Sequence, residues 1–301
     1  MRLRVGAQCK AGSRMTDVDY DKIAADAGLE RVGARPPLGA YLAELWERRH
    51  FAYTLARFRI QATMSENRLG LGWIVLRPIF TAIIFGTIFG FIMPAGSRPE
   101  NFIPFLVVGV FTFEFFSKSF SAGAKAITSN ASLVRSLSFP RMLLPLASVL
   151  QQVFELIPII GVMALIVVIT GETITWNWLL VPVVFAVMTM FNLGVSLISA
   201  RLTVHLRDVT QIIPLLTRIL FYSSGIFYSL EKVLAPPKPE WLLTVAELNP
   251  IYIFLKLVRA QMVAGTTAST HDWVVVTGAA FVILVIGIVF FWRAEERYGR
   301  D

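Results

Sequence analysis

Six apolar segments, each close to the length that crosses a lipid bilayer, constrain this chain more than any other feature. They cover residues 74–93, 102–122, 142–169, 178–200, 212–230 and 273–292. A helix needs about 20 apolar residues to cross the hydrocarbon core. The composition agrees, because 55% of the 301 residues are hydrophobic, 16% are charged and the mean hydropathy is +0.65. We therefore expect an all-α membrane protein with six transmembrane helices.

Three of these segments have special features. The third is long and contains Pro145 and Pro158, which predict a kink. The fifth is short and has Arg218 near its start, so we expect it to enter the membrane at an angle or to be broken. In the first, Gly86 and Gly90 allow a close helix approach, either within the chain or between two copies.

The basic residues predict the orientation of the chain. Residues 40–77, 117–142, 201–211 and 293–301 carry fifteen Lys and Arg residues on one side, against five on the other. Because loops rich in Lys and Arg stay in the cytoplasm, we expect both termini to be cytoplasmic in a multi-pass protein of the plasma membrane. These clusters flank apolar segments and account for the net charge of +8, so nucleic acid is not an expected partner.

The regions outside the apolar segments also have distinct characters. Residues 1–38 form a polar tail whose true start is Met1 or Met15, and the single Cys9 excludes an internal disulfide. Residues 39–66 mix aromatic side chains with Glu and Arg, which predicts an amphipathic helix in the membrane interface. Residues 231–264 hold a proline-rich break and then apolar residues at helical spacing, which predicts short helices on the outer side.

A basic, proline-punctuated stretch at 126–145 joins the second and third segments. Ser129, Asn130 and Ser132 suit the N-cap of a short helix. The side chains that offer apolar or charged contacts to a partner are Leu133, Leu137, Phe139, Arg135 and Arg141. The residues alone fit either a docking surface or an ordinary basic cytoplasmic loop.

The chain lacks the motifs of several enzyme classes. None of its seven lysines follows a glycine, so it has no phosphate-binding loop, and it has neither His-Glu-x-x-His nor Gly-x-Ser-x-Gly. Glu114 and Lys118 are four residues apart and are expected to pair. Glu155 shares a polar face with two glutamines, which serves either hydrogen bonding between helices or contact with a substrate or proton. We expect no catalytic residue, metal site or cofactor in this chain.

Four stretches, in their order and spacing, resemble the membrane subunit of ABC type-2 polysaccharide exporters, the family that exports O-antigen, teichoic acid and mycobacterial galactan. They are SENRLGLGWIVLRP at 65–78, LVRSLSFPRMLLP at 133–145, HLRDV at 205–209 and LNPI at 248–251. The resemblance covers about residues 40–292 and leaves the polar tail outside.

The resemblance implies a permease rather than an enzyme. It implies a homodimer that works with two separate ATPase subunits, which bind ATP and Mg. A coupling helix at about 126–138 would dock on the ATPase, 39–66 would be the interfacial helix, and 231–264 would be outer gate helices. The candidate ATPase-coupling residues are Ser132, Leu133, Arg135, Phe139, Arg141, Arg207 and Asp208. For the last two, the alternative is a brace between the fourth and fifth segments.

Aromatic residues of the first, second and fifth segments are candidates for a glycan path, because sugars stack their CH faces on aromatic rings. The candidates are Phe85, Phe89, Phe111, Phe115, Tyr222 and Tyr228. The alternative is that these rings pack in the core or face lipid. The two tyrosines are the stronger candidates because their hydroxyls need a hydrogen-bond partner.

The expected function is ATP-driven export of a lipid-linked polysaccharide from the inner to the outer leaflet. Arg outnumbers Lys by 21 to 7, which is typical of a high-GC actinobacterium. In such a cell the family's substrate would be the lipid-linked galactan precursor of the cell wall. The alternatives are an ABC type-2 exporter of drugs or lipids and a membrane glycosyltransferase.

Overall fold

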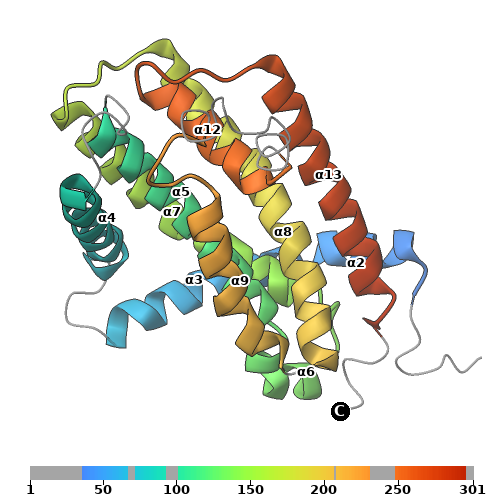
Figure 1. The fold of residues 1–301 in the computed structure, drawn as a ribbon. Helices are drawn as coiled ribbons and strands as arrows, with labels where there is room; N and C mark the ends of the chain where they lie inside the picture. Colours follow the sequence, from blue (N-terminus) through green and yellow to red (C-terminus); the bar gives the residue numbers. More distant parts are fainter. Residues whose placement is uncertain (1–35, 67–71, 93–100, 207, 231–247, 296–301) are drawn as a thin grey trace, which may run out of the picture. The chain divides into compact units, whose positions relative to one another are not determined.

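Helices account for all the regular structure in the part of the chain that is described. The computed structural model describes residues 36–66, 72–92, 101–206, 208–230 and 248–295, so most of the polar tail lies outside it. In chain order (Figure 1) the elements are α2 (Leu38–Glu47), α3 (Arg49–Glu66), α4 (Gly72–Ile92), α5 (Phe102–Ala124), η2 (Thr128–Asn130), α6 (Ala131–Ser136), α7 (Leu143–Ile169), η3 (Trp176–Leu180), α8 (Val181–His205), α9 (Val209–Ser223), α12 (Pro250–Met262) and α13 (Thr270–Trp292). The prediction of an all-α membrane protein is confirmed.

Four of the six predicted spans are confirmed as helices long and apolar enough to cross a membrane. They are α5 with 23 residues, α7 with 27, the continuous η3 and α8 with 30, and α13 with 23. Pro158 lies inside α7 and does not end it. For the apolar helices α4 and α9 the spanning role stays a prediction.

The fifth predicted segment is broken. Its helix α9 has 15 residues, about 22 Å at 1.5 Å per residue, which is short of a hydrocarbon core of about 30 Å. The helix ends at Ser223, and the chain then turns at Gly225, which has φ +61. This left-handed conformation favours glycine and explains why the helix stops there.

The helix α8 lies at the centre and packs against both α13 and α5. A Cβ atom at Gly194 would lie 2.6 Å from the carbonyl oxygen of Ile283, and one at Gly287 would lie 2.6 Å from that of Gly194. Two glycines therefore let the backbones of α8 and α13 come together. The predicted pair does not do this within the chain, because a Cβ atom at Gly90 would meet nothing within 4 Å and one at Gly86 would make only ordinary contact at 3.4 Å.

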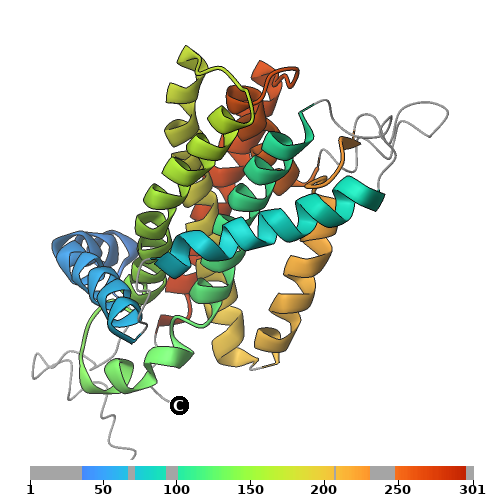
Figure 2. The ribbon, with the colours of Figure 1, turned by 90° about the vertical axis from the view of Figure 1, so that its left-hand side faces the viewer.

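The predicted interfacial segment consists of two helices, one of the two arrangements that its sequence allows. The break lies at Arg48, between α2 and α3, and α3 packs along α7 (Figure 2). Ala52 and Ala56 of α3 are buried, whereas Tyr53 and Phe58 are largely exposed. The exposed aromatic rings agree with an interfacial position, which stays a prediction.

We name the two ends of the helix assembly by the element found there. The α6 end is where α5 ends and α7 begins. The α12 end is where α5 begins and α7 ends, and α12 lies there beside α5, α8 and α13 (Figure 1).

Candidate functional site

The predicted coupling segment folds as a short helical turn at the α6 end. The 3-10 helix η2 leads into α6 between α5 and α7, so a helix near 126–138 is found. Asn130, one of the predicted capping residues, occupies the N-cap position of α6, but Asn130 makes no side-chain hydrogen bond to the start of that helix. Its Nδ2 donates to the carbonyl of Ala126 at 2.7 Å, and the Ser129 hydroxyl donates to that of Lys125 at 2.7 Å. These side chains satisfy carbonyls at the end of α5 instead.

The helix α6 is anchored by one face and exposed on the other. Val134 is buried and Leu133 is half-buried, both in a cluster with Met142 and Tyr41. Ser132, Arg135 and Leu137 are exposed. Of the coupling candidates in α6, Ser132 and Arg135 therefore face outward, and Leu133 faces the protein.

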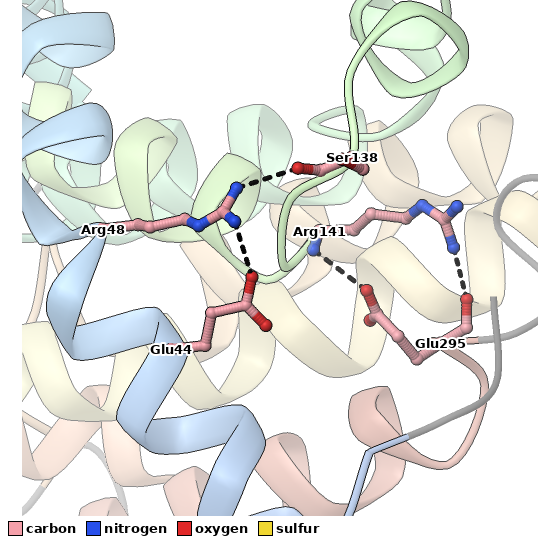
Figure 3. A network of polar contacts seen from close by, with 5 residues as sticks. All are labelled: Glu44, Arg48, Ser138, Arg141 and Glu295. Carbon is pink, nitrogen blue, oxygen red and sulfur yellow. Dashed lines mark hydrogen bonds and ion pairs between the residues drawn. The ribbon is translucent and has the colours of Figure 1, made fainter. Parts of the chain in front are cut away.

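Phe139 and Arg141, in the segment that leads into α7, contact the protein's own elements. The ring of Phe139 lies 5.1 Å from that of Phe51 on α3. The backbone amide of Arg141 donates to Oε1 of Glu295 at 3.0 Å, and its guanidinium donates to the carbonyl oxygen of Glu295 (Figure 3). Arg141 is thus bound to the segment that follows α13.

Glu295 is the centre of this arrangement. Its Oε2 accepts a hydrogen bond from the Tyr41 hydroxyl at 2.9 Å, and the same hydroxyl accepts one from the Met142 amide at 3.2 Å. We call Tyr41, Arg141, Met142 and Glu295 the Glu295 junction. Burial raises the pKa of Glu295 above its ordinary value, while its hydrogen bonds and the charge of Arg141 oppose that rise.

A second contact beside the junction also ties α2 to the loop before α7. Arg48 donates from Nη1 to the carbonyl of Ser138 at 2.8 Å and pairs through Nη2 with Glu44 at 3.0 Å (Figure 3). The sequence interpretation missed the Tyr41–Glu295 and Arg48–Ser138 contacts. Partners some 90 to 254 residues apart leave no local pattern in the sequence.

The remaining coupling candidates lie before α9. Asp208 is exposed and occupies the N-cap position of α9 without a side-chain hydrogen bond there. Arg207 lies outside the described residues. Their role therefore stays a prediction.

The candidate path residues separate into two groups. Phe85 and Phe89 of α4 are half-buried and contact Phe227, the latter with stacked rings 4.1 Å apart. Tyr222 is 51% exposed. In the second group, Phe111 and Phe115 are buried in the core. These two rings have no exposed face in the single chain, as the packing alternative expects.

The polar residues of the apolar helices pair within their own helices, as predicted for Glu114 and Lys118 but not for Glu155, for which a bond between helices or a substrate contact was expected. Lys118 lies 2.9 Å from Glu114, and Gln151 donates to Glu155 at 3.0 Å. Among the described residues, no group of three or more His, Cys, Asp and Glu side chains could hold a metal ion.

The predicted outer gate region contains the helix α12, while residues 231–247 lie outside the described part. Asn249 is its N-cap, with Oδ1 accepting from the Ile251 amide at 3.1 Å, and Pro250 is the first helical residue. The second half of the LNPI stretch is thus a helix start, for which Asn and Pro are well suited. Asn249 also donates to the Ser224 hydroxyl at 3.0 Å, which ties α12 to the turn after α9.

Arg259 of α12 is the most deeply buried cation described. Its Nε, Nη1 and Nη2 atoms donate to the carbonyls of Phe105, Gly225 and Ile226 at 3.1, 3.0 and 3.0 Å. Burial lowers its pKa to about 9, so it remains charged at neutral pH. A Cβ atom at Gly109 would lie 2.3 Å from Nη2, so this glycine makes room for the guanidinium. An arginine within an apolar helical run is the sequence signal that could have found this contact.

Comparison with known proteins finds one matching family and several relatives. The family model described as ABC-2 type transporter matches residues 51–263. The chain is 24% identical over 241 residues to the O-antigen export system permease protein RfbA of Klebsiella pneumoniae, across 79% of this chain and 90% of that protein. It is 26% identical over 190 residues to the protein of the same name from Myxococcus xanthus, across 63% and 72%. It is 24% identical over 239 residues to the polysialic acid transport protein KpsM of Escherichia coli, across 79% and 90%.

The family match runs from α3 through α12 and includes the α6 segment. The resemblance inferred from four short stretches is confirmed, and so is the expectation of a transport protein rather than an enzyme, which removes the glycosyltransferase alternative. Because the match covers more than half of its length, the chain belongs to the ABC-2 type transporter family.

Proposed function

We propose that this chain is the membrane subunit of an ATP-driven exporter that moves a lipid-linked polysaccharide from the inner to the outer leaflet. The proposed cargo is the galactan precursor of the cell wall. The protein lies in the plasma membrane with its α6 end on the cytoplasmic side. A second copy of the chain and two ATPase subunits complete the transporter. The support is that relatives matched over 90% of their length are named for export of O-antigen or transport of polysialic acid.

The main support for ATPase docking at α6 is the way in which this helix is anchored to the rest of the protein. Buried Val134 holds the helix, and the Glu295 junction fixes the chain that leaves it, while Ser132 and Arg135 stay exposed. An anchored helix with an exposed charged face can transmit a movement of a bound ATPase to the helices α5 and α7 that it joins. The sequence has no phosphate-binding loop, so a partner must hydrolyse the ATP.

The docking is tested by Arg135→Glu in the permease co-expressed with the ATPase of the same transporter. Reversing a charge at the edge of an interface should weaken co-purification of the ATPase by about tenfold, because it replaces an attraction by a repulsion. The matched control is Arg57→Glu, an exposed arginine on α3. Normal co-purification together with normal transport in Arg135→Glu would refute α6 as the docking element.

The cargo is tested by depleting the protein in its native cell. Lipid-linked galactan should then accumulate on the inner side of the membrane, while newly displayed galactan declines. Normal galactan display with altered drug susceptibility would instead favour the drug-exporter alternative. This result would leave the family and the docking experiment unaffected.

A further inference from the structure

The α12 end contains a cavity of about 320 Å³ whose polar wall is basic. Its wall comes from the start of α5, the turn after α9, the helix α12 and the loop that follows α12. The lining side chains used below are Phe105, Lys256 and Arg259. This volume lies within the range of small-ligand sites.

Among the described residues around the cavity, cations outnumber carboxylates. Lys256 and Arg259 are three residues apart and therefore project from one face of α12. Asp272 pairs with Lys256, with Oδ2 and Nζ 3.3 Å apart, and also accepts the Ser269 amide at 2.8 Å. Glu172 lines a separate cavity beyond residues 263–266, where its Oε2 accepts the Ala264 amide at 2.9 Å. Of the described charged residues, Lys256 and Arg259 line the basic cavity, and Asp272 pairs with Lys256 without lining it.

Arg259 carries the excess charge. It is 3% exposed, and none of the ion pairs within the described ranges includes it. Within the described part of the chain it contacts three neutral carbonyls and the face of the Phe105 ring, whose centre lies 3.5 Å from Cζ. A guanidinium has five N–H groups, so two lie outside these three bonds. A buried charge held by neutral dipoles is costly, and an anion beside it lowers that cost.

We propose that this cavity binds a phosphate group, carried by a lipid headgroup in the adjoining leaflet or free in solution. Phosphate oxygens accept several hydrogen bonds at once, and cationic side chains bind them more strongly than neutral donors do. The apolar wall at Phe105 suits the neighbouring carbons of a headgroup. The site goes beyond the proposed function, because it does not depend on which polysaccharide is exported.

A bound phosphate would also hold the α12 end together. Arg259 already links α12 to Phe105 on α5 and to Gly225 after α9. An anion that neutralises Arg259 and Lys256 stabilises this arrangement of the three elements. Binding should therefore appear as a rise in the melting temperature of the protein.

The experiment measures the melting temperature of the purified full-length protein in a neutral detergent at constant ionic strength. The probes are inorganic phosphate, short-chain phosphatidylglycerol and, as a phosphate-free control, a short-chain diacylglycerol. The melting temperature should rise saturably with a phosphate probe and not with diacylglycerol. A rise with phosphatidylglycerol alone identifies the headgroup as the source, and a rise with inorganic phosphate at similar concentrations identifies the free ion.

Two substitutions should shift the half-saturating concentration in opposite directions. Lys256→Gln should raise the half-saturating concentration about tenfold, because one charge-assisted hydrogen bond to the phosphate is lost. Asp272→Asn should lower it, because it removes the carboxylate while an amide oxygen can still accept the Ser269 amide. Lys125→Gln, exposed at the α6 end, should leave it unchanged. A wild-type protein that no phosphate probe stabilises, or an unchanged half-saturating concentration in Lys256→Gln, would overturn the proposal.

Discussion

The α6 end and the α12 end are each tied together by one buried charged residue, but the two residues have opposite signs. At the α6 end, Glu295 accepts hydrogen bonds from Tyr41 and Arg141, which lie 254 and 154 residues away. At the α12 end, Arg259 donates to carbonyls, among them that of Phe105, which also lies 154 residues away. Both residues therefore join elements that local sequence cannot bring together.

The difference lies in how the charge is compensated. The carboxylate of Glu295 accepts hydrogen bonds from the Tyr41 hydroxyl and the Arg141 backbone amide, and the charge of Arg141 favours its ionised form. It can also accept a proton, so its charge can be removed. The guanidinium of Arg259 faces neutral carbonyls and keeps its charge over the pH range of most experiments. We therefore expect the α6 end to respond to protons and the α12 end to respond to anions and to the loss of Arg259 itself.

The largest effect should come from Arg259→Leu. It removes a buried donor from three carbonyls at once, so the free energy of unfolding should fall by about 3 kcal/mol or more. The loss of stability is measured by the melting temperature in detergent, or by the fraction of protein that is folded and monodisperse. Lys125→Leu, which removes an exposed cation, is the control. A loss below about 1 kcal/mol would show that the carbonyls find other partners.

A smaller loss is expected from Gly109→Ala. The added methyl would lie 2.3 Å from Nη2 of Arg259, and the guanidinium cannot move without giving up its bonds. Overpacking of this kind costs about 1–3 kcal/mol. Gly90→Ala adds the same methyl where nothing lies within 4 Å and should be neutral or mildly stabilising.

The double variant Gly109→Ala, Arg259→Leu separates the two effects. If the methyl acts through the guanidinium, the two losses will not add, because the clash partner is already gone. Strict additivity would contradict the role given to Gly109.

Much of the fold could be predicted because a membrane span is a local property. About 20 consecutive apolar residues suffice to predict α5, α7, α8 and α13, and basic residues mark their flanks. The short α9 shows the limit of this approach. Its 212–230 segment is mostly apolar, yet the helix stops just before the turn at Gly225, and composition alone does not place that turn.

The contacts between helices could not be predicted in the same way. Gly194 and Gly287 meet because α8 and α13 cross there, whereas Gly86 and Gly90 have the familiar spacing and make no close approach within the chain. Likewise, the positive charge of Arg141 suggested a contact with a partner protein, whereas in the structure Arg141 contacts Glu295 of the same chain. The sequence shows which residues are basic or small, but the packing of the helices determines which residues they contact.

The smallest predicted effect concerns pH and the Glu295 junction. Burial is the main cause that raises the pKa of Glu295 above 4.5, with a further rise from Glu44, while hydrogen bonds from Arg141 and Tyr41 and the charge of Arg141 lower it. A raised pKa means that the folded state binds this proton more tightly than the unfolded state does. The resulting stabilisation is fully present below pH 4.5 and is lost as the pH rises through the pKa of the folded state.

This predicts a loss of stability as the pH rises above 4.5, and Glu295→Gln should abolish that loss, because an amide does not titrate. Melting temperatures measured from pH 4 upward, in steps of about half a unit, test the slope. Glu47→Gln, an exposed glutamate on α2, should keep the wild-type slope, and so should Lys256→Gln at the α12 end. An equal change of slope in Lys256→Gln would mean that the two ends are coupled through the helices between them, and the contrast between a proton-sensitive and an anion-sensitive end would fail.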